Sequence, residues 1–199
     1  MLILAAHPDL AQSRVTRSLL DAVHELPGVE LRELYRLYPD YAIDVAAEQV
    51  AVAEARLLVL LHPLHWYSMP ALQKLWLDEV LRFGWAYGPG GEALKGKALW
   101  LVSSTGGAAA SYQAEGYNAH PIDAFLLPYA QTARLCGMAY RPPLLLHGAH
   151  RASDAELARH AAAFVVGLTA HQPTEEAAAL PDIPLDARPA LFSPLKGAA

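Results

Sequence analysis

The amino-acid sequence predicts an α/β fold, a three-layer sandwich in which helices cover both faces of a five-stranded parallel sheet. Short apolar runs alternate five times with longer segments of helical period, a pattern typical of βα units. The third run, residues 57–61, is entirely apolar, as expected of a central strand buried on both faces. The second run, residues 29–35, is more polar and suits the edge position that the strand order 2-1-3-4-5 assigns to it.

Residue types at the boundaries of the helical segments predict where the helices begin. Asp44 is the expected N-cap of the second helix, and Ser153 and Glu156 have the spacing of a capping box before the fifth. Ser68 is the expected N-cap of the third helix, with Pro70 in its first turn, where a missing N–H costs nothing. The apolar side of that third helix is expected to comprise Leu72, Leu75, Trp76, Val80 and Phe83.

Glycine and proline predict where helices end or bend. The first helix is expected to stop at Pro27-Gly28, and the fourth, covering about residues 122–136, is expected to end at Gly137 and to kink at Pro128.

The apolar side of the second helix is expected to comprise Val45, Val50, Val52 and Ala53. The expected strands are residues 2–6, 29–35, 57–61, 98–102 and 144–147.

Composition indicates one domain followed by a tail. A length of 199 residues is close to a single domain at about 150 residues per domain. Five of the fifteen prolines fall in the last twenty-nine residues, where no apolar period remains. We therefore expect a domain at residues 1–170 and an extended Pro-rich tail at residues 171–199.

Charge and cysteine content exclude several classes of protein. Fifteen basic against twenty acidic residues, with no basic run, disfavour nucleic-acid binding. The apolar runs are far shorter than the ~20 residues of a membrane helix. Cys136, the single cysteine, excludes an internal disulfide and a Cys-based zinc cluster. We expect a cytoplasmic protein.

Hydrogen-bonding and aromatic side chains gather in the loops after the first, third and fourth strands. These loops are residues 7–16, 63–68 and 103–107. In a sheet of order 2-1-3-4-5 ligands bind where the order reverses, between strands 1 and 3. The three loops are therefore expected to converge on one binding site.

Each loop has a possible use in binding and an ordinary structural alternative. Ser13 and Thr16, with the free N–H groups of the first helix, could hold a phosphate, with His7 or Arg14 supplying positive charge. The alternative is that Ser13 serves only as an N-cap.

The other two loops leave the same choice open. Trp66 and Tyr67 could form a wall against a flat ring, or they could be core aromatic residues under a loop. Thr105-Gly106-Gly107 permits close approach of backbone N–H donors to a ligand, although Gly-Gly is also ordinary turn material.

The sequence resembles the flavodoxin-like NAD(P)H:quinone oxidoreductases, and within them the bacterial ancillary proteins of glutathione-regulated potassium-efflux systems. The resemblance covers about residues 1–169. Its most specific part is the segment HPLHWYSMPALQKLWLDEV at residues 62–80, continued by FGWAYG at residues 83–88. The Ala-His-Pro start and the Ser-Thr-Gly-Gly loop agree with it in order and spacing.

The resemblance implies a bound flavin, FMN or, in some relatives, FAD. Thr16 stands where relatives often carry Asn and keeps a hydroxyl. Tyr112 and His120 are the nearest matches to the Tyr and His that face the substrate in the family, with Tyr117 and Asn118 as competitors. The implied flavin contacts are His7, Ser13, Arg14, Val15 and Thr16 for the phosphate; Pro63, Leu64, His65, Trp66 and Tyr67 for the isoalloxazine ring; and Ser104, Thr105, Gly106 and Gly107 for its polar edge.

The implied activity is ping-pong transfer of a hydride from NAD(P)H through the flavin to a quinone or similar small acceptor. Family members are homodimers with the flavin at the interface. A second interpretation is a redox-sensing regulatory subunit that docks on a potassium-efflux antiporter and so lies peripheral to the inner membrane.

Other enzyme classes are poorly supported. The first loop lacks the glycine pattern of a Walker or Rossmann nucleotide site, and no Gly-x-Ser-x-Gly elbow of a serine hydrolase occurs. His62 and His65, like His147 and His150, are three residues apart, so on a strand they point to opposite faces and form no natural metal chelate. We expect no bound metal, and Cys136 is expected to be a core residue.

Overall fold

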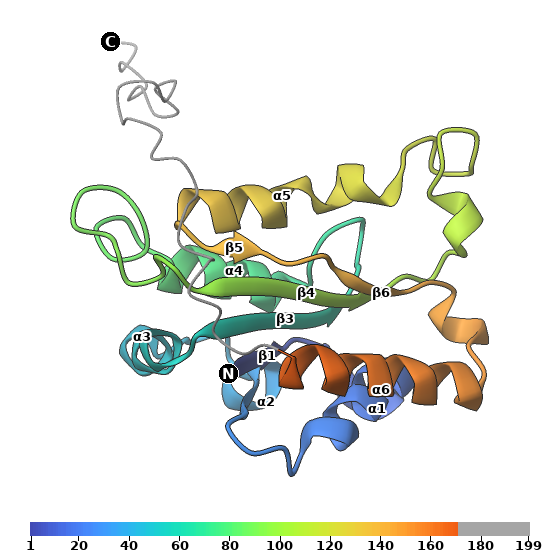
Figure 1. The fold of residues 1–199 in the computed structure, drawn as a ribbon, viewed down its shortest axis with the longest axis horizontal. Helices are drawn as coiled ribbons and strands as arrows, with labels where there is room; N and C mark the ends of the chain where they lie inside the picture. The colour runs from blue at the N-terminus through green and yellow to red at the C-terminus, as the bar shows by residue number, and fades with distance from the viewer. Residues whose placement is uncertain (171–199) are drawn as a thin grey trace.

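One parallel sheet organises the chain (Figure 1). A computed structural model describes residues 1–170, and the expected tail at residues 171–199 lies outside the described residues. The strand order is β2-β1-β3-β4-β5, with β6 also paired to β4, so the predicted order is confirmed. The strands are β1 (Leu2–Ala5), β2 (Glu30–Glu33), β3 (Leu57–Pro63), β4 (Ala98–Ser104), β5 (Ala139–Tyr140) and β6 (Leu144–Leu146).

Helices cover both faces of the sheet, as the three-layer prediction requires. Figure 1 shows α5 on one side of the sheet and α1 and α6 together on the other. Strand side chains alternate between two cores: Leu58 and Leu60 enter the core under α3, α4 and α5, whereas Leu57, Val59 and Leu61 enter the core under α1 and α6. The helices are α1 (Arg14–Val23), α2 (Leu34–Leu37), α3 (Val45–Glu54), α4 (Ala71–Val80), α5 (Ile122–Leu135) and α6 (Asp154–Thr169).

The predicted caps of α3, α5 and α6 are confirmed. The Asp44 side chain accepts a hydrogen bond from the Ala47 N–H at 3.0 Å. Ser153 and Glu156 cap each other's backbone at the start of α6. Gly137, in the left-handed region at φ 68°, follows α5, within which Pro128 lies.

The predicted start and buried side of α4 are partly wrong. Its N-cap is Pro70 rather than Ser68, because proline restricts the residue before it to extended backbone and so prevents an earlier helical start. The helix ends at Val80, so Phe83 lies beyond it and is 68% exposed. Its ring packs edge-on against Tyr87.

Both outer strands also differ from the prediction. The strand expected at residues 29–35 is only four residues long, because the chain turns into α2 at Leu34. The fifth strand is split into β5 and β6, which pair with the two ends of β4. Pro142 and Pro143 separate them, since proline has no N–H to donate to the ladder.

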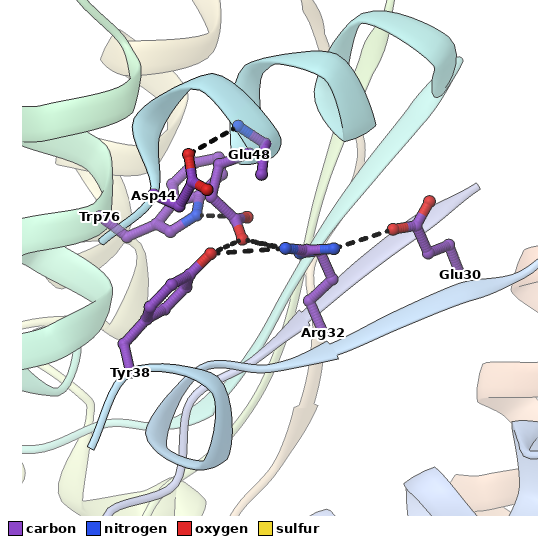
Figure 2. Close-up of polar contacts among 7 residues, drawn as sticks. Glu30, Arg32, Tyr38, Asp44, Glu48 and Trp76 are labelled. Carbon is purple, nitrogen blue, oxygen red and sulfur yellow. Dashed lines mark hydrogen bonds and ion pairs between the residues drawn. The ribbon is translucent and has the colours of Figure 1, made fainter. Parts of the chain in front are cut away.

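A buried carboxylate ties the edge strand β2 to α3 and α4 (Figure 2). Glu48 is fully buried and accepts hydrogen bonds from Arg32 Nε at 2.7 Å, from Trp76 Nε1 at 2.8 Å and from the Tyr38 hydroxyl. The predicted apolar face of α3 is therefore wrong in part, because Glu48 points inward while Val50 is 59% exposed. These three hydrogen bonds, together with the ion pair to the Arg32 guanidinium, make this burial tolerable.

None of the helices in residues 1–170 combines the length and apolar character needed to cross a membrane.

We expect Glu48→Ala to lower the free energy of unfolding by about 3–5 kcal/mol, because it removes the acceptor of the buried Tyr38 hydroxyl and Trp76 N–H and leaves the partly buried Arg32 guanidinium with Glu30 alone. Chemical denaturation measures this. The control is Glu54→Ala at the exposed end of the same helix, which should change stability by less than about 0.5 kcal/mol. Equal effects of the two substitutions would show that the Glu48 cluster does not stabilise the fold.

Candidate functional site

The loops after β1, β3 and β4 meet at one edge of the sheet. The three strands are parallel neighbours, with Ala5 opposite Leu61 and Pro63 opposite Ser104. The His7 and His65 rings, one from each of the first two loops, lie edge to face with centroids 6.3 Å apart. The structure thus brings together the three loops that the sequence singled out.

In the first loop, Ser13 caps α1, so its ordinary structural role is present. Its Oγ accepts the Thr16 N–H at 3.1 Å, and both side chains are buried. Val15 packs into the core, so only its backbone can reach a ligand. The first-turn N–H groups of Arg14 and Val15 have no acceptor within the helix and remain available as donors.

The Arg14 side chain is engaged elsewhere. Its guanidinium donates to the Ala152 carbonyl at 2.9 Å and to Asp154 Oδ1 at 2.8 Å, at the start of α6. His7 is therefore the better source of positive charge in this loop. Burial and the neighbouring His65 lower the pKa of His7, and a phosphate bound close to the ring would raise it again.

The second loop is a tight turn with an unusual backbone. His65 and Ser68 exchange both backbone hydrogen bonds, at 2.9 and 3.0 Å. Between them Trp66 and Tyr67 have φ of 49° and 64°, a left-handed conformation that bulky residues rarely adopt. Such strain persists where the surroundings impose it and is concentrated at functional sites.

The same turn exposes its aromatic side chains. Trp66 is 93% exposed, so the alternative of a core aromatic under a loop is wrong for this residue. The Tyr67 ring stacks on Phe125 with centroids 5.1 Å apart, and its hydroxyl donates to Asn118 Oδ1 at 3.3 Å. Trp66 is thus an unpacked flat surface held beside a fixed Tyr67.

The third loop has one buried and one exposed residue at its centre. The Thr105 hydroxyl donates to the Gly107 carbonyl at 2.8 Å, and Thr105 is buried whereas Gly106 is exposed. A Cβ on Gly107 would lie 3.3 Å from the Tyr112 ring. A side chain at position 107 would therefore press on Tyr112, and glycine lets the two approach.

The candidate substrate-facing residues pack around Phe125, which lies in the first turn of α5. The rings of Tyr112 and His120 lie 5.9 and 6.1 Å from it, both edge to face. His120 Nδ1 is 3.1 Å from the Asn118 carbonyl, which can only accept, so Nδ1 carries the proton. Tyr117, the other competitor, is 91% exposed and directed to solvent.

A cleft opens beside this site, between the first loop and α2. The cleft is lined chiefly by His7, Asp9, Leu10, Glu33, Tyr35 and Arg36.

Within residues 1–170, no group of three or more His, Cys, Asp or Glu side chains is arranged to hold a metal ion.

Comparison with known proteins identifies the family. The family model described as a flavodoxin-like fold matches residues 1–166. The chain belongs to the flavodoxin-like family. It is 44% identical over 164 residues to the glutathione-regulated potassium-efflux system ancillary protein KefF of Enterobacter sp., covering 80% of this chain and 92% of the relative. The resemblance inferred from residues 62–88 is therefore confirmed.

Solved structures of similar proteins agree with this membership. The general stress protein 14 of Treponema denticola, in complex with FMN, superposes with a TM-score of 0.81 at 41% identity, covering 86% of this chain and 98% of the other. A protein from P. pentosaceus described as an NADPH-quinone reductase has a TM-score of 0.75 at 31% identity, covering 82% and 94%.

Two residues at the site of this flavodoxin-like protein escaped the sequence reasoning. Phe125 was not singled out because it lies in the first turn of a helix rather than at a strand end. His147 follows the fifth strand, whose exit was considered only for metal binding. It lies 3.0 Å from the Thr105 hydroxyl and packs against Tyr112. Its place directly after a strand is the signal that could have found it.

We expect Trp66→Gly to raise the free energy of unfolding of the flavin-free protein by about 0.5–1 kcal/mol, since glycine adopts positive φ without strain. Thermal and chemical unfolding measure this. Trp66→Ala is the matched control, because it removes the same ring but keeps the Cβ that causes the strain. If alanine stabilises as much as glycine, exposure of the ring rather than the backbone is responsible.

Buried His62 makes stability depend on pH. Burial lowers the pKa of His62 to about 4 from its ordinary 6.5, and its ring stacks on Tyr129. Below pH 6.5 the unfolded chain takes up a proton that the folded chain does not, so stability falls as pH drops from 6.5 toward 4, by about 3 kcal/mol for this group.

His62→Phe should flatten this fall, as measured by denaturant unfolding at several pH values. The other buried histidines are present in both proteins, so their contributions cancel in the comparison. His24→Phe is the control for replacing a histidine by phenylalanine at an exposed position. An identical slope in His62→Phe would mean that the pKa of His62 is not lowered in the folded state.

Proposed function

We propose that this protein is a flavin-dependent NAD(P)H:quinone oxidoreductase that binds FMN, or alternatively FAD, at the carboxyl edge of its sheet. The observation that carries the proposal is the strained turn at Trp66 and Tyr67. It holds an exposed indole at the exit of the central strand, between the loops of His7 and Thr105. The FMN-bound structure and the NADPH-quinone reductase among similar proteins support the same chemistry.

The residues at this edge fit a flavin. Free N–H groups of Arg14 and Val15 at the start of α1 suit its phosphate, with Ser13 and Thr16 holding that turn in place. Trp66 offers a face for a flat ring. The remaining proposed contacts of the ring are Pro63, Leu64, His65 and Tyr67, with Ser104, Thr105, Gly106 and Gly107 at its polar edge.

When bound, the flavin would supply two-electron chemistry, taking a hydride from NAD(P)H and passing it to a quinone in ping-pong turnover. The chain supplies donors for the developing charge on the acceptor oxygen. The Tyr112 hydroxyl is one proposed donor. His120 is the other, and because its Nδ1–H points to the Asn118 carbonyl, its Nε2 donates only when the ring is protonated.

We further propose that residues 1–170 form one flavin-binding domain that assembles as a homodimer in the cytoplasm. The support is a set of exposed apolar side chains that a partner copy would cover. They include Trp66, Phe83 and Leu127, exposed by 93, 68 and 65%.

A regulatory function is the second candidate. The relative from Enterobacter is an ancillary protein of a potassium-efflux system, which favours docking of this protein on a membrane antiporter. Co-purification with such an antiporter, with a flavin that NADPH does not reduce, would favour this function over catalysis.

The absorption spectrum of the purified protein tests the proposed function. We expect flavin bands at about 375 and 450 nm that NADPH bleaches and menadione restores in the absence of air. A colourless protein that takes up neither FMN nor FAD would contradict the proposal.

We expect Tyr112→Phe to slow reoxidation by menadione by about 10²-fold while reduction by NADPH changes little, because the lost hydroxyl serves the acceptor. Stopped-flow absorbance separates the two half-reactions. Tyr117→Phe is the control, since that side chain faces solvent. Equal loss in both half-reactions would place Tyr112 in flavin binding instead.

A further inference from the structure

The loop after β6 is bonded to the loop after β4 along its length. The Thr105 N–H donates to the Leu146 carbonyl, the Ala149 N–H to the Thr105 carbonyl, and the Gly148 N–H to the Gly107 carbonyl, each at 2.9 Å. Residues on both sides of His147 are thus paired with the third loop of the site. The backbone holds the His147 ring next to Thr105.

The hydrogen bonds of Thr105 determine which nitrogen of His147 is protonated. The Thr105 hydroxyl lies 2.8 Å from the Gly107 carbonyl and 3.0 Å from His147 Nδ1. A carbonyl oxygen only accepts, and a hydroxyl has one proton, which goes to Gly107. Nδ1 of His147 therefore carries a proton and donates it to Thr105.

His147 also contacts the proposed acceptor-facing tyrosine. Its ring centroid lies 5.5 Å from that of Tyr112. Partial burial lowers the pKa of His147, which favours the neutral ring at neutral pH. One uncharged imidazole thus touches both the loop proposed for the flavin edge and Tyr112.

We propose that His147 is a positioning residue. By donating from Nδ1 it fixes the Thr105 hydroxyl as the donor to the Gly107 carbonyl and so holds the third loop in the conformation proposed to bind the flavin edge, and its ring supports Tyr112. This inference rests on the proposed function for its consequence, although the hydrogen-bond chain itself does not require a flavin.

The first test uses the flavin-free protein. Long-range ¹H–¹⁵N spectra of ¹⁵N-histidine-labelled protein at neutral pH report which ring nitrogen carries the proton. Comparison with His147→Asn assigns the His147 signals. We expect the Nδ1–H tautomer. The Nε2–H tautomer would overturn the proposal whether or not the protein binds flavin.

The second test measures the FMN dissociation constant by quenching of flavin fluorescence. We expect His147→Leu to weaken binding about tenfold, because it removes the donor to a buried hydroxyl. His147→Asn, whose side-chain N–H can replace Nδ1–H, should stay within about twofold of the unmodified protein. For the Thr105→Val substitution used below, the control is Thr132→Val, which removes a threonine hydroxyl that is bonded to the Pro128 carbonyl on α5.

A double-mutant cycle separates positioning from general destabilisation. In a Thr105→Val background, His147→Leu should cost no further FMN affinity, because the acceptor hydroxyl is already gone. Full additivity of the two effects, or failure of His147→Asn to restore affinity, would overturn the proposal. Should His147→Leu fail to fold, His147→Phe replaces it in the same cycle, because phenylalanine keeps a flat ring against Tyr112 and lacks the donor to Thr105.

The two ideas can fail separately. If the unmodified protein binds neither FMN nor FAD, the proposed function fails, whereas the tautomer measurement still decides the His147 hydrogen bond. If it binds FMN and the His147 variants bind it equally well, only the positioning role is contradicted.

Discussion

Parallel pairing of β3 with both of its neighbours is the constraint on which the site depends. β3 and β4 match over seven positions from Leu57 with Ala98 to Pro63 with Ser104, and β1 is paired to the other side of β3. Both long strands are buried almost throughout, which fixes their register. Because parallel strands end at the same edge, their loops must meet there. No loop needs its own means of reaching the others.

The cost of the site is concentrated in a few residues. Two consecutive aromatic residues in the left-handed region strain the backbone by about 1–3 kcal/mol each. The paired backbone bonds of His65 and Ser68, together with the stacking of Tyr67 on Phe125, oppose that strain. Glu48 and its hydrogen-bond partners hold the outer strand β2 in place. Because β2 pairs with β1, they also support the strand that carries the first loop of the site. The two features that ordinary residue preferences disfavour, the left-handed backbone at Trp66 and Tyr67 and the buried Glu48, therefore both help to hold the site in shape.

Periodicity and the positions of glycine, proline and capping residues predicted the alternation of strands and helices and the caps at Asp44 and Ser153, because these follow from local chemistry. The strand order followed from the fold class that this alternation indicates. Local chemistry could not predict that Glu48 would be buried, since its partners Arg32, Tyr38 and Trp76 come from three other segments. The same limit explains His147, whose role depends on a loop 42 residues earlier. The hydrogen bond from Arg14 to Asp154 likewise joins two helices that lie far apart in the sequence.

Hydrogen–deuterium exchange of the flavin-free protein, with and without added FMN, tests most directly whether the three loops form one binding site. The account predicts that FMN slows exchange together in peptides covering residues 7–16, 64–68 and 104–107. Protection confined to residues 7–11 and 33–36, the cleft beside the first loop, would contradict it. So would FMN binding that leaves residues 64–68 unprotected.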